Sequence, residues 1–320
     1  MPLEDYAVRL ARVLDVDLPP ATDSQRYPLP RVRDLRVESA ADRVDILDFL
    51  AMGDCRLQAV VAEKNSSLGR VADESGQLKL DLDFLRHGEA CAAMLTAEEP
   101  ALADELRRVI RLKQTRLASR IWQATLGGAE FRRFWHSDYS ATIDPRTLQA
   151  IQALALDISR WLQGDYSDYD DLDQLLGIIG EGSGGGMLRA WEELGGGLQR
   201  ATLAVKTFSA KRPLCYDGMQ TPEADIFRRV VMKFFVGEIQ KTVAGLNRTT
   251  HELMPVIHDL ENRLSVAEPA AYTDWRGERD AMIEAARLAM VAHVGALEPL
   301  MVQCGFLPQQ QERVNDDHQD

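Results

Sequence analysis

Polar residues that directly follow a helical segment are the first place in this chain where chemistry could occur. Residues 55–71 read CRLQAVVAEKNSSLGRV and pass from helix-forming residues to Asn-Ser-Ser-Leu-Gly. Ser66 and Ser67 could act as nucleophiles, but no Gly-x-Ser-x-Gly motif and no nearby histidine accompanies them, so a serine triad is not indicated. If a ligand site exists, we expect it among the polar residues at the end of this segment, Glu63, Asn65, Ser66 and Arg70.

The same residues also have a structural interpretation, which we favour. Asn65 tolerates the left-handed conformation that ends many helices, and Gly69 permits a positive φ. Ser66 or Ser67 can cap the segment that follows. A helix end and a turn therefore account for residues 65–69, and no catalytic residue can be assigned.

Histidines and acids occur in two other segments, where a metal ion could bind. His251 and His258 lie about 10 Å apart along a helix, too far to share one metal directly. His258 and Glu261 could form half of a site, but a solvated polar face is the favoured interpretation.

The second segment resembles a calcium loop in its acids, Asp165, Asp168, Asp170, Asp171 and Asp173. It lacks the glycine and the terminal glutamate of such a loop. Acids at a helix start are explained by the helix dipole, so we expect no metal and no cofactor.

Two segments could contact phosphate or another anion. GEGSGGG at 180–186 has no Gly-Lys-Ser/Thr and follows no convincing strand, so we interpret it as a flexible hinge. One helix is basic and carries Arg107, Arg108, Arg111, Lys113, Arg116 and Arg120. Contact with anionic lipid or glycan is conceivable, but a solvated face paired with neighbouring acids is favoured.

The composition excludes several classes of protein. The chain has 320 residues, with 37 Lys and Arg against 50 Asp and Glu, a net charge of −13. This charge argues against generic nucleic-acid binding, because phosphate contacts need a basic surface. No run of about 18 apolar residues occurs, so no membrane-spanning helix is expected. The opening MPLEDYAVRL shows no basic stretch followed by an apolar one, so no signal peptide is recognised.

Apolar periodicity predicts an all-α fold, a multi-helix bundle with an extended, proline-bearing segment at 18–37. The predicted helices cover residues 3–14, 45–64, 77–95, 101–126, 147–162, 170–179, 187–210, 221–264 and 272–302. The helix from 221 starts with a capping Thr-Pro-Glu, and we expect it to kink or break at Gly237, Gly245 and Pro255. We predict a single helical domain at 1–308, which could subdivide near 180–186, and a disordered tail at 309–320.

The four cysteines are either free thiols of a cytoplasmic protein or two disulfides formed in an oxidising compartment. A helical wheel over 45–64 favours one pairing: with Ile46 at zero, Leu57 returns close to zero, whereas Cys55 lies about 180° away. That side carries small residues, Ala51, Ala59 and Ala62. It would let the helix at 77–95 approach at Gly88 and Cys91, within the Cα distance that a disulfide needs. We therefore predict the disulfides Cys55–Cys91 and Cys215–Cys304.

Five segments together resemble one family of proteins. They are PRVRDLRV (30–37), DILDFLAMGDCRLQAVVAEKNSSLGRV (45–71), WQATLGGAEFRRFW (122–135), RPLCYDGMQTP (212–222) and CGF (304–306). The family is uncharacterised, comprises proteobacterial proteins classed only as a domain of unknown function, and is often described as lipoproteins. Its most specific part is Cys-x-Leu-Gln-x-x-x-Ala-Glu-Lys/Arg-Asn-Ser-Ser-Leu-Gly. The resemblance implies an envelope location and favours the disulfides, but it implies no activity; the secretory signal and lipidated cysteine of such proteins do not occur in this sequence.

We therefore predict a periplasmic, lipid-anchored helical protein of the outer membrane that binds or scaffolds an envelope component rather than catalysing a reaction. Its partner would be an envelope protein, lipid or glycan and not a nucleic acid, and it would touch the membrane only through the anchor. Two alternatives stay open: an envelope hydrolase with an acid or histidine site assembled in space, and a carrier with an apolar cavity between helices.

Overall fold

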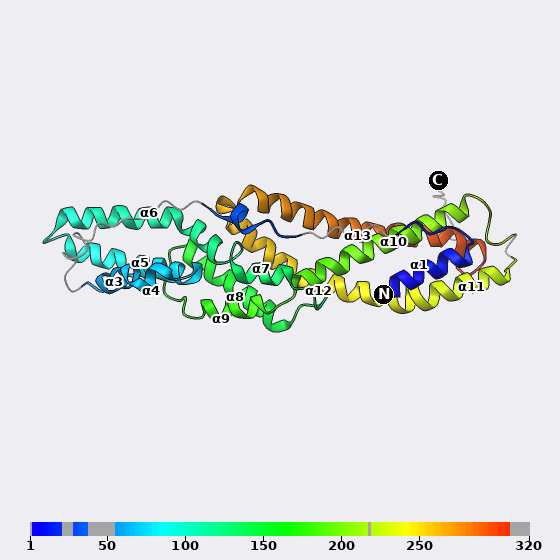
Figure 1. Cartoon of the computed structure of the whole chain (residues 1–320), viewed down its shortest axis with the longest axis horizontal. Helices are drawn as coiled ribbons and strands as arrows, with labels where there is room; N and C mark the ends of the chain where they lie inside the picture. Colours follow the sequence, from blue (N-terminus) through cyan, green and yellow to red (C-terminus); the bar gives the residue numbers. More distant parts are fainter. Residues whose placement is uncertain (1, 21–27, 38–54, 217–218, 308–320) are drawn as a thin grey trace, which may run out of the picture. The chain divides into compact units, whose positions relative to one another are not determined.

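The computed structural model describes residues 2–20, 28–37, 55–216 and 219–307, and every regular element in these ranges is a helix (Figure 1). The elements are α1 (Pro2–Val13), η1 (Val32–Leu35), α3 (Leu57–Asn65), α4 (Ser67–Val71), α5 (Glu74–Leu95), α6 (Pro100–Ala124), α7 (Ala129–His136), α8 (Pro145–Leu162), α9 (Leu172–Gly180), α10 (Gly184–Ser209), α11 (Pro222–Val230), η2 (Val231–Ile239), α12 (Gln240–Arg263), η3 (Ser265–Ala267) and α13 (Ala270–Gln303). One isolated bridge joins Tyr216 to Met219. The predicted all-α fold is confirmed.

Several stretches differ from the predicted helices, among them α4, which lies between two predicted helices. The helix predicted over 45–64 is described only from Leu57, because residues 45–54 lie outside the described ranges, and Cys55 precedes α3 in a non-helical conformation. α7 follows α6 where we predicted no helix, and Gly128, in an extended conformation, directly precedes it. A helix of 8 residues with three buried aromatic side chains is too short for its apolar period to stand out.

The long segment from residue 221 is divided by a π-helix, in agreement with the expected kink or break. Thr221 caps α11 as predicted, by accepting a hydrogen bond from the amide of Ala224. η2, which contains Gly237, is a π-helix between α11 and α12, whereas Gly245 and Pro255 lie inside α12 without ending it. Proline removes one backbone hydrogen bond, but burial of neighbouring side chains stabilises the helix around the missing bond.

The described chain forms two compact units. Unit 1 contains the described residues of Met1–Arg26, Leu188–Asn247 and Arg279–Asp320, and unit 2 contains those of Tyr27–Met187 and Arg248–Glu278. The chain passes from one unit to the other at several points, and one of them, between residues 187 and 188, directly follows the glycine-rich segment. That the chain folds as one domain stays a prediction.

A buried histidine connects several elements of unit 1. The ring nitrogens of His293 on α13 lie 2.7 Å from Tyr6 Oη on α1 and 3.0 Å from Thr202 Oγ1 on α10. Phe235 of η2 packs on the same ring, with a centroid distance of 4.9 Å. Burial lowers the pKa of His293 to about 4, so the ring is neutral at pH 7 and hydrogen-bonds on both sides.

Contrary to the sequence expectation, α13 is long and apolar enough to span a membrane by length and composition, with a mean hydropathy of 1.3 over its most apolar window. A core helix has the same properties. His293, Leu297 and Leu300 of α13 are all buried in unit 1, and the histidine has two hydrogen-bond partners there. In that window 33% is buried in the described structure, so the length and composition of α13 are weak evidence for a membrane span.

Both predicted disulfides are present: Cys55–Cys91 in unit 2, with a Cα–Cα distance of 5.7 Å, and Cys215–Cys304 in unit 1, with a distance of 5.2 Å. The reason for the first pairing differs from the prediction. Ala59 and Ala62 are exposed, so the small-residue side of α3 does not pack on another helix. Cys55 instead reaches Cys91 of α5 from the turn that precedes α3.

The glycine-rich segment makes close packing contacts, whereas its role as a hinge stays a prediction. Gly184 is buried at the start of α10, and a Cβ atom there would come well under 3.0 Å from the ring of Phe134. A Cβ atom on Gly182 would lie 2.6 Å from Cγ2 of Thr147. Ser183 Oγ donates a hydrogen bond to the Ser137 carbonyl at 2.9 Å. These glycines therefore allow α10 to begin directly against α7 and α8.

Replacing Gly184 by alanine should lower the free energy of unfolding by about 1–3 kcal/mol, because the added methyl group overpacks the contact with Phe134. Gly196, in the same helix, has no atom within 4 Å of its Cβ position and provides the matched control. Gly196→Ala should be neutral or stabilise by up to about 1 kcal/mol through helix propensity. Urea unfolding followed by circular dichroism measures both, and equal effects of the two substitutions would contradict the packing role.

Candidate ligand-binding site

The polar residues at 65–69 form a tight turn between α3 and α4. Ser66 ends α3, donating its amide to the Glu63 carbonyl at 3.1 Å, and it caps α4, its hydroxyl accepting the amide of Gly69 at 3.0 Å. The predicted serine cap is therefore confirmed at Ser66. Asn65 does not have a positive φ, which among the described non-glycine residues occurs at Asp15, so the predicted left-handed helix end is wrong.

Gly69 is needed for space rather than for its backbone conformation. Its φ is not positive, which corrects the prediction. A Cβ atom at this position would lie well under 3.0 Å from the carbonyl oxygen of Glu63 and 2.8 Å from that of Lys64. The short α4 can therefore fold back directly on the end of α3. Gln77 Nε2 donates to the Gly69 carbonyl at 2.6 Å and attaches this turn to α5.

A buried carboxylate holds α3, α5 and α6 together. Asp81 on α5 is 3% exposed, and its Oδ1 lies 2.6 Å from Nζ of Lys64 and 2.7 Å from Nζ of Lys113. Its Oδ2 lies 3.1 Å from Nε of Arg120. Burial raises the pKa of Asp81, but attraction to Lys113 and Lys64 and their hydrogen bonds outweigh it, so the pKa is lowered. Asp81 is therefore ionised at neutral pH and fixes the end of α3 against α5.

The basic helix α6 is accordingly not a uniformly solvated face. Arg107 and Arg108 pair with acids one turn earlier, Asp104 at 3.0 Å and Glu105, as predicted for a solvated, paired face. Lys113, in contrast, is buried against Asp81, which corrects the prediction at this residue.

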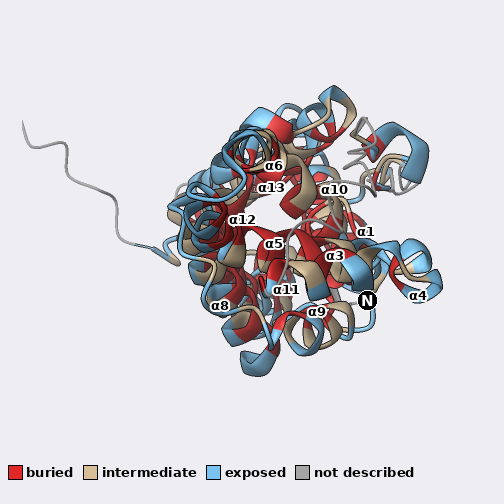
Figure 2. Cartoon of the chain, turned by 90° about the vertical axis from the view of Figure 1, so that its left-hand side faces the viewer, coloured by how far each residue is buried: buried red, intermediate tan, exposed pale blue. Residues whose placement is uncertain are grey.

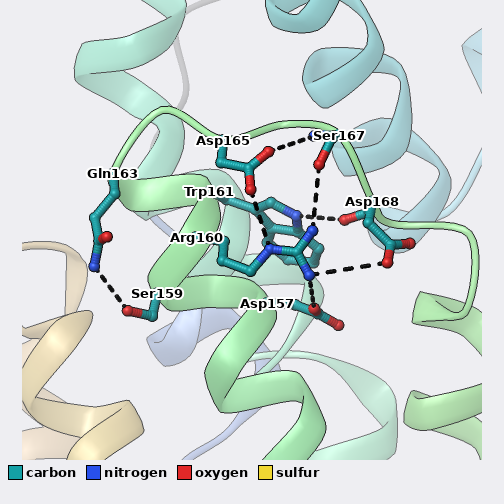
Figure 3. Close-up of polar contacts among 8 residues, drawn as sticks. All are labelled: Asp157, Ser159, Arg160, Trp161, Gln163, Asp165, Ser167 and Asp168. Atoms are coloured by element: carbon teal, nitrogen blue, oxygen red, sulfur yellow. Dashed lines mark hydrogen bonds and ion pairs between the residues drawn. The ribbon is translucent and has the colours of Figure 1, made fainter.

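A loop between α8 and α9 forms another side of the site (Figure 3). Arg160, near the end of α8, binds Asp165 at 3.2 Å, Ser167 at 3.3 Å and Asp168 at 3.8 Å. Trp161 Nε1 donates to the Asp168 carbonyl at 2.9 Å. Two of the acids that resemble a calcium loop therefore neutralise an arginine and shape the loop.

The same loop and the first turn of α9 are attached to α5 by three further hydrogen bonds. Tyr169 Oη donates to Oδ1 of Asp83 at 2.7 Å. Asp173 accepts from Lys79 Nζ at 2.6 Å and from Ser75 Oγ at 2.9 Å. Burial and the hydrogen bond to Asp83 raise the pKa of Tyr169 to about 12, so its hydroxyl stays protonated and donates at neutral pH.

These elements border a surface pocket of about 390 Å³, the α4 pocket. Its volume falls within the range of about 300–1,000 Å³ that is common for ligand sites. It is lined by Glu63, Ser66, Leu68, Gly69, Ala72, Gly76, Lys79, Leu80, Asp83 and Tyr169.

Two of the four predicted ligand-binding residues, Glu63 and Ser66, line this pocket. Asn65 and Arg70 are exposed outside the lining, and Arg70 Nε lies 3.4 Å from the Ser66 carbonyl oxygen. Ligand binding at these residues stays a prediction.

The polar groups of the opposite wall were not predicted. Lys79 and Asp83 lie four residues apart on a helix that the sequence did predict, and this spacing places them on one face, a signal that could have found them. Tyr169 offered no such signal, because its position depends on how Arg160 folds the loop.

The α4 pocket combines a carboxylate with apolar surface. Glu63 is exposed and forms no ion pair with any residue that the structure describes. Leu80 forms a buried part of the lining, whereas Leu68 and Val71 on α4 are 79% and 78% exposed. Figure 2 shows α4 as largely exposed. Within α4, Gly69 is buried.

The other histidine and acid cluster is not a solvated polar face throughout. Glu261 is fully buried and accepts a hydrogen bond from Tyr272 Oη at 3.0 Å, which corrects the prediction, whereas His251 is exposed. Within the described ranges, no group of three or more His, Cys, Asp or Glu side chains could hold a metal ion.

Replacing Asp81 by asparagine should lower the free energy of unfolding by about 3–5 kcal/mol at pH 7, because it leaves buried cations unpaired. The folded-state pKa of Asp81 is lowered, so ionised Asp81 adds to the free energy of unfolding at pH values above its unfolded pKa of about 3.9. This added stability is lost as the pH falls further. The difference between wild type and variant should therefore shrink below about pH 4. Urea unfolding across pH measures it.

The matched control is Asp104→Asn, which removes an exposed pair with Arg107 and should change stability by less than about 0.5 kcal/mol. A loss at Asp81 no larger than this control would show that the buried cluster does not hold the three helices.

Comparison with known proteins gives one match. The model of a family described as "Protein of unknown function (DUF3080)" matches residues 3–308. No curated protein matches the chain, and no solved structure does.

Proposed function

Since this chain belongs to the DUF3080 family of proteins of unknown function, we propose its function from its own residues and from the resemblance to envelope lipoproteins. It is a periplasmic, lipid-anchored protein of the outer membrane that binds an envelope component at the α4 pocket rather than catalysing a reaction. The observation that carries the binding role is this pocket, in which fixed polar groups adjoin exposed apolar residues.

The cysteines support the oxidising compartment. All four are paired, as Cys55–Cys91 and Cys215–Cys304. Structural disulfides form and persist in secreted and periplasmic proteins, whereas reductants keep most cytosolic thiols free. The pairs close segments of 36 and 89 residues, a separation at which a disulfide is worth about 3–5 kcal/mol in the chain-entropy model.

The α4 pocket supports binding because its polar groups are held in place before any partner arrives. Tyr169 is fixed to Asp83, and Lys79 is fixed to Asp173. Groups that are already ordered lose little conformational entropy on association, which favours affinity. Leu68 and Val71 stand beside them in solvent, where they add nothing to the core and offer apolar area to a partner.

The compartment can be tested in cells that produce the natural protein. After acid quenching and treatment with a maleimide mass tag, we expect no tag on any of the four cysteines, and four tags only after reduction. Intact-protein mass spectrometry reads the number of tags. Four tags without reduction would place the chain in a reducing compartment and contradict the proposal.

Binding at the pocket can be tested by photo-crosslinking in the same cells. A photoreactive benzoylphenylalanine in place of Leu68 should give a discrete adduct, because this side chain borders the pocket and is 79% exposed. The control is the same residue in place of Val266, which is 87% exposed and lies outside the pocket. No adduct at position 68, or the same adduct at both positions, would contradict the proposed site.

A further inference from the structure

We propose that the partner at the α4 pocket is a basic protein segment, which places a lysine or arginine toward Glu63 and an adjacent apolar side chain on Leu68 and Val71. This inference rests on the proposed binding function and names the chemistry of its partner.

The charges around the pocket favour a cation. Glu63 lies in the last turn of α3, where the helix dipole adds partial negative charge, and no cation among the described residues pairs with it. The neighbouring lysines are directed elsewhere: Lys64 binds Asp81 and Lys79 binds Asp173.

Asp83 adds a second carboxylate to the lining. It accepts a hydrogen bond from Tyr169 and lies 3.4 Å from Nε2 of His87. Arg86 acts on Tyr169 from the same helix, so positive charge is also present beside this wall. Of the two carboxylates in the lining, Glu63 has no cationic partner in the described part of the chain. An entering ammonium or guanidinium group would form an ion pair with it.

The apolar surface lies where a second side chain of the same segment would pack. Leu68 and Val71 are three residues apart on α4, so they share one face, opposite the buried Gly69. Together with the buried Leu80 of the lining, they give the site apolar surface next to its carboxylates.

The openness of the site favours a protein segment over a small molecule. Small ligands are usually bound in concave sites that bury about 70–90% of their surface. The α4 pocket opens to solvent, and Val71 lies outside its lining, so a small molecule inside it would leave Val71 exposed. A peptide segment crossing α4 would cover both Leu68 and Val71 while one side chain enters the pocket.

The inference can be tested by selecting displayed peptides of random sequence on the full chain. We expect the selected peptides to share a lysine or arginine next to an apolar residue. Binding of one fluorescently labelled selected peptide, followed by polarisation, should weaken about tenfold with Glu63→Gln and with Leu68→Ser. It should also weaken with rising salt. Glu89→Gln, an exposed acid of α5 outside the pocket, is the matched control and should change affinity less than about twofold.

The outcomes separate this inference from the function on which it rests. Selected peptides without a basic residue, or binding that is unchanged by Glu63→Lys in a variant with normal circular dichroism, would overturn the basic segment. If the adduct at position 68 nevertheless forms, and its mass is that of a small molecule or a glycan, the pocket is a binding site for another class of partner. If neither peptides nor an adduct are obtained, the proposed binding function fails as well.

Discussion

The buried carboxylate of Asp81 is the interaction on which the candidate site depends. It is shared by Lys64 at the end of α3 and by Lys113 and Arg120 of α6. A charge removed from water costs several kcal/mol unless it is paired, so loss of one partner would leave the others buried and unpaired, and the intact cluster fixes how these helices pack. The position of α3 on α5 follows from this constraint, and the pocket lies where α4 leaves the end of α3.

α3 is held at both ends by α5. The disulfide between Cys55 and Cys91 attaches the residues just before α3 to α5. The ion pair of Lys64 with Asp81 attaches the last turn of α3 to α5. A helix of 9 residues is marginal in water by itself, so tertiary links must supply its stability. Gly69 then allows α4 to fold back, which gives α4 one buried residue and an outer face that is free for a partner.

Stability and the proposed recognition use different faces of the same short helix. The inner side of α4 is occupied by the Ser66 cap and by Gly69 against the carbonyl groups of α3. Leu68 and Val71 remain in solvent on the outer side. The loop that Arg160 folds brings Tyr169 to the opposite wall, so the walls come from segments that are widely separated in sequence.

The sequence by itself determined the helical class, most helix positions and the cap at Ser66, because periodicity and capping act over a few residues. Both disulfide pairs were also predicted, but the small-residue contact from which the first pair was argued does not occur. Of the four residues that the sequence indicated as a possible ligand site, Glu63 and Ser66 line the α4 pocket. The tertiary structure alone decided that Tyr169 meets Asp83, 86 residues away, and that the glycine-rich segment packs against Phe134 and Thr147. Those outcomes depend on which side chains meet after the chain has folded, and local spacing carries no information about contacts over that separation.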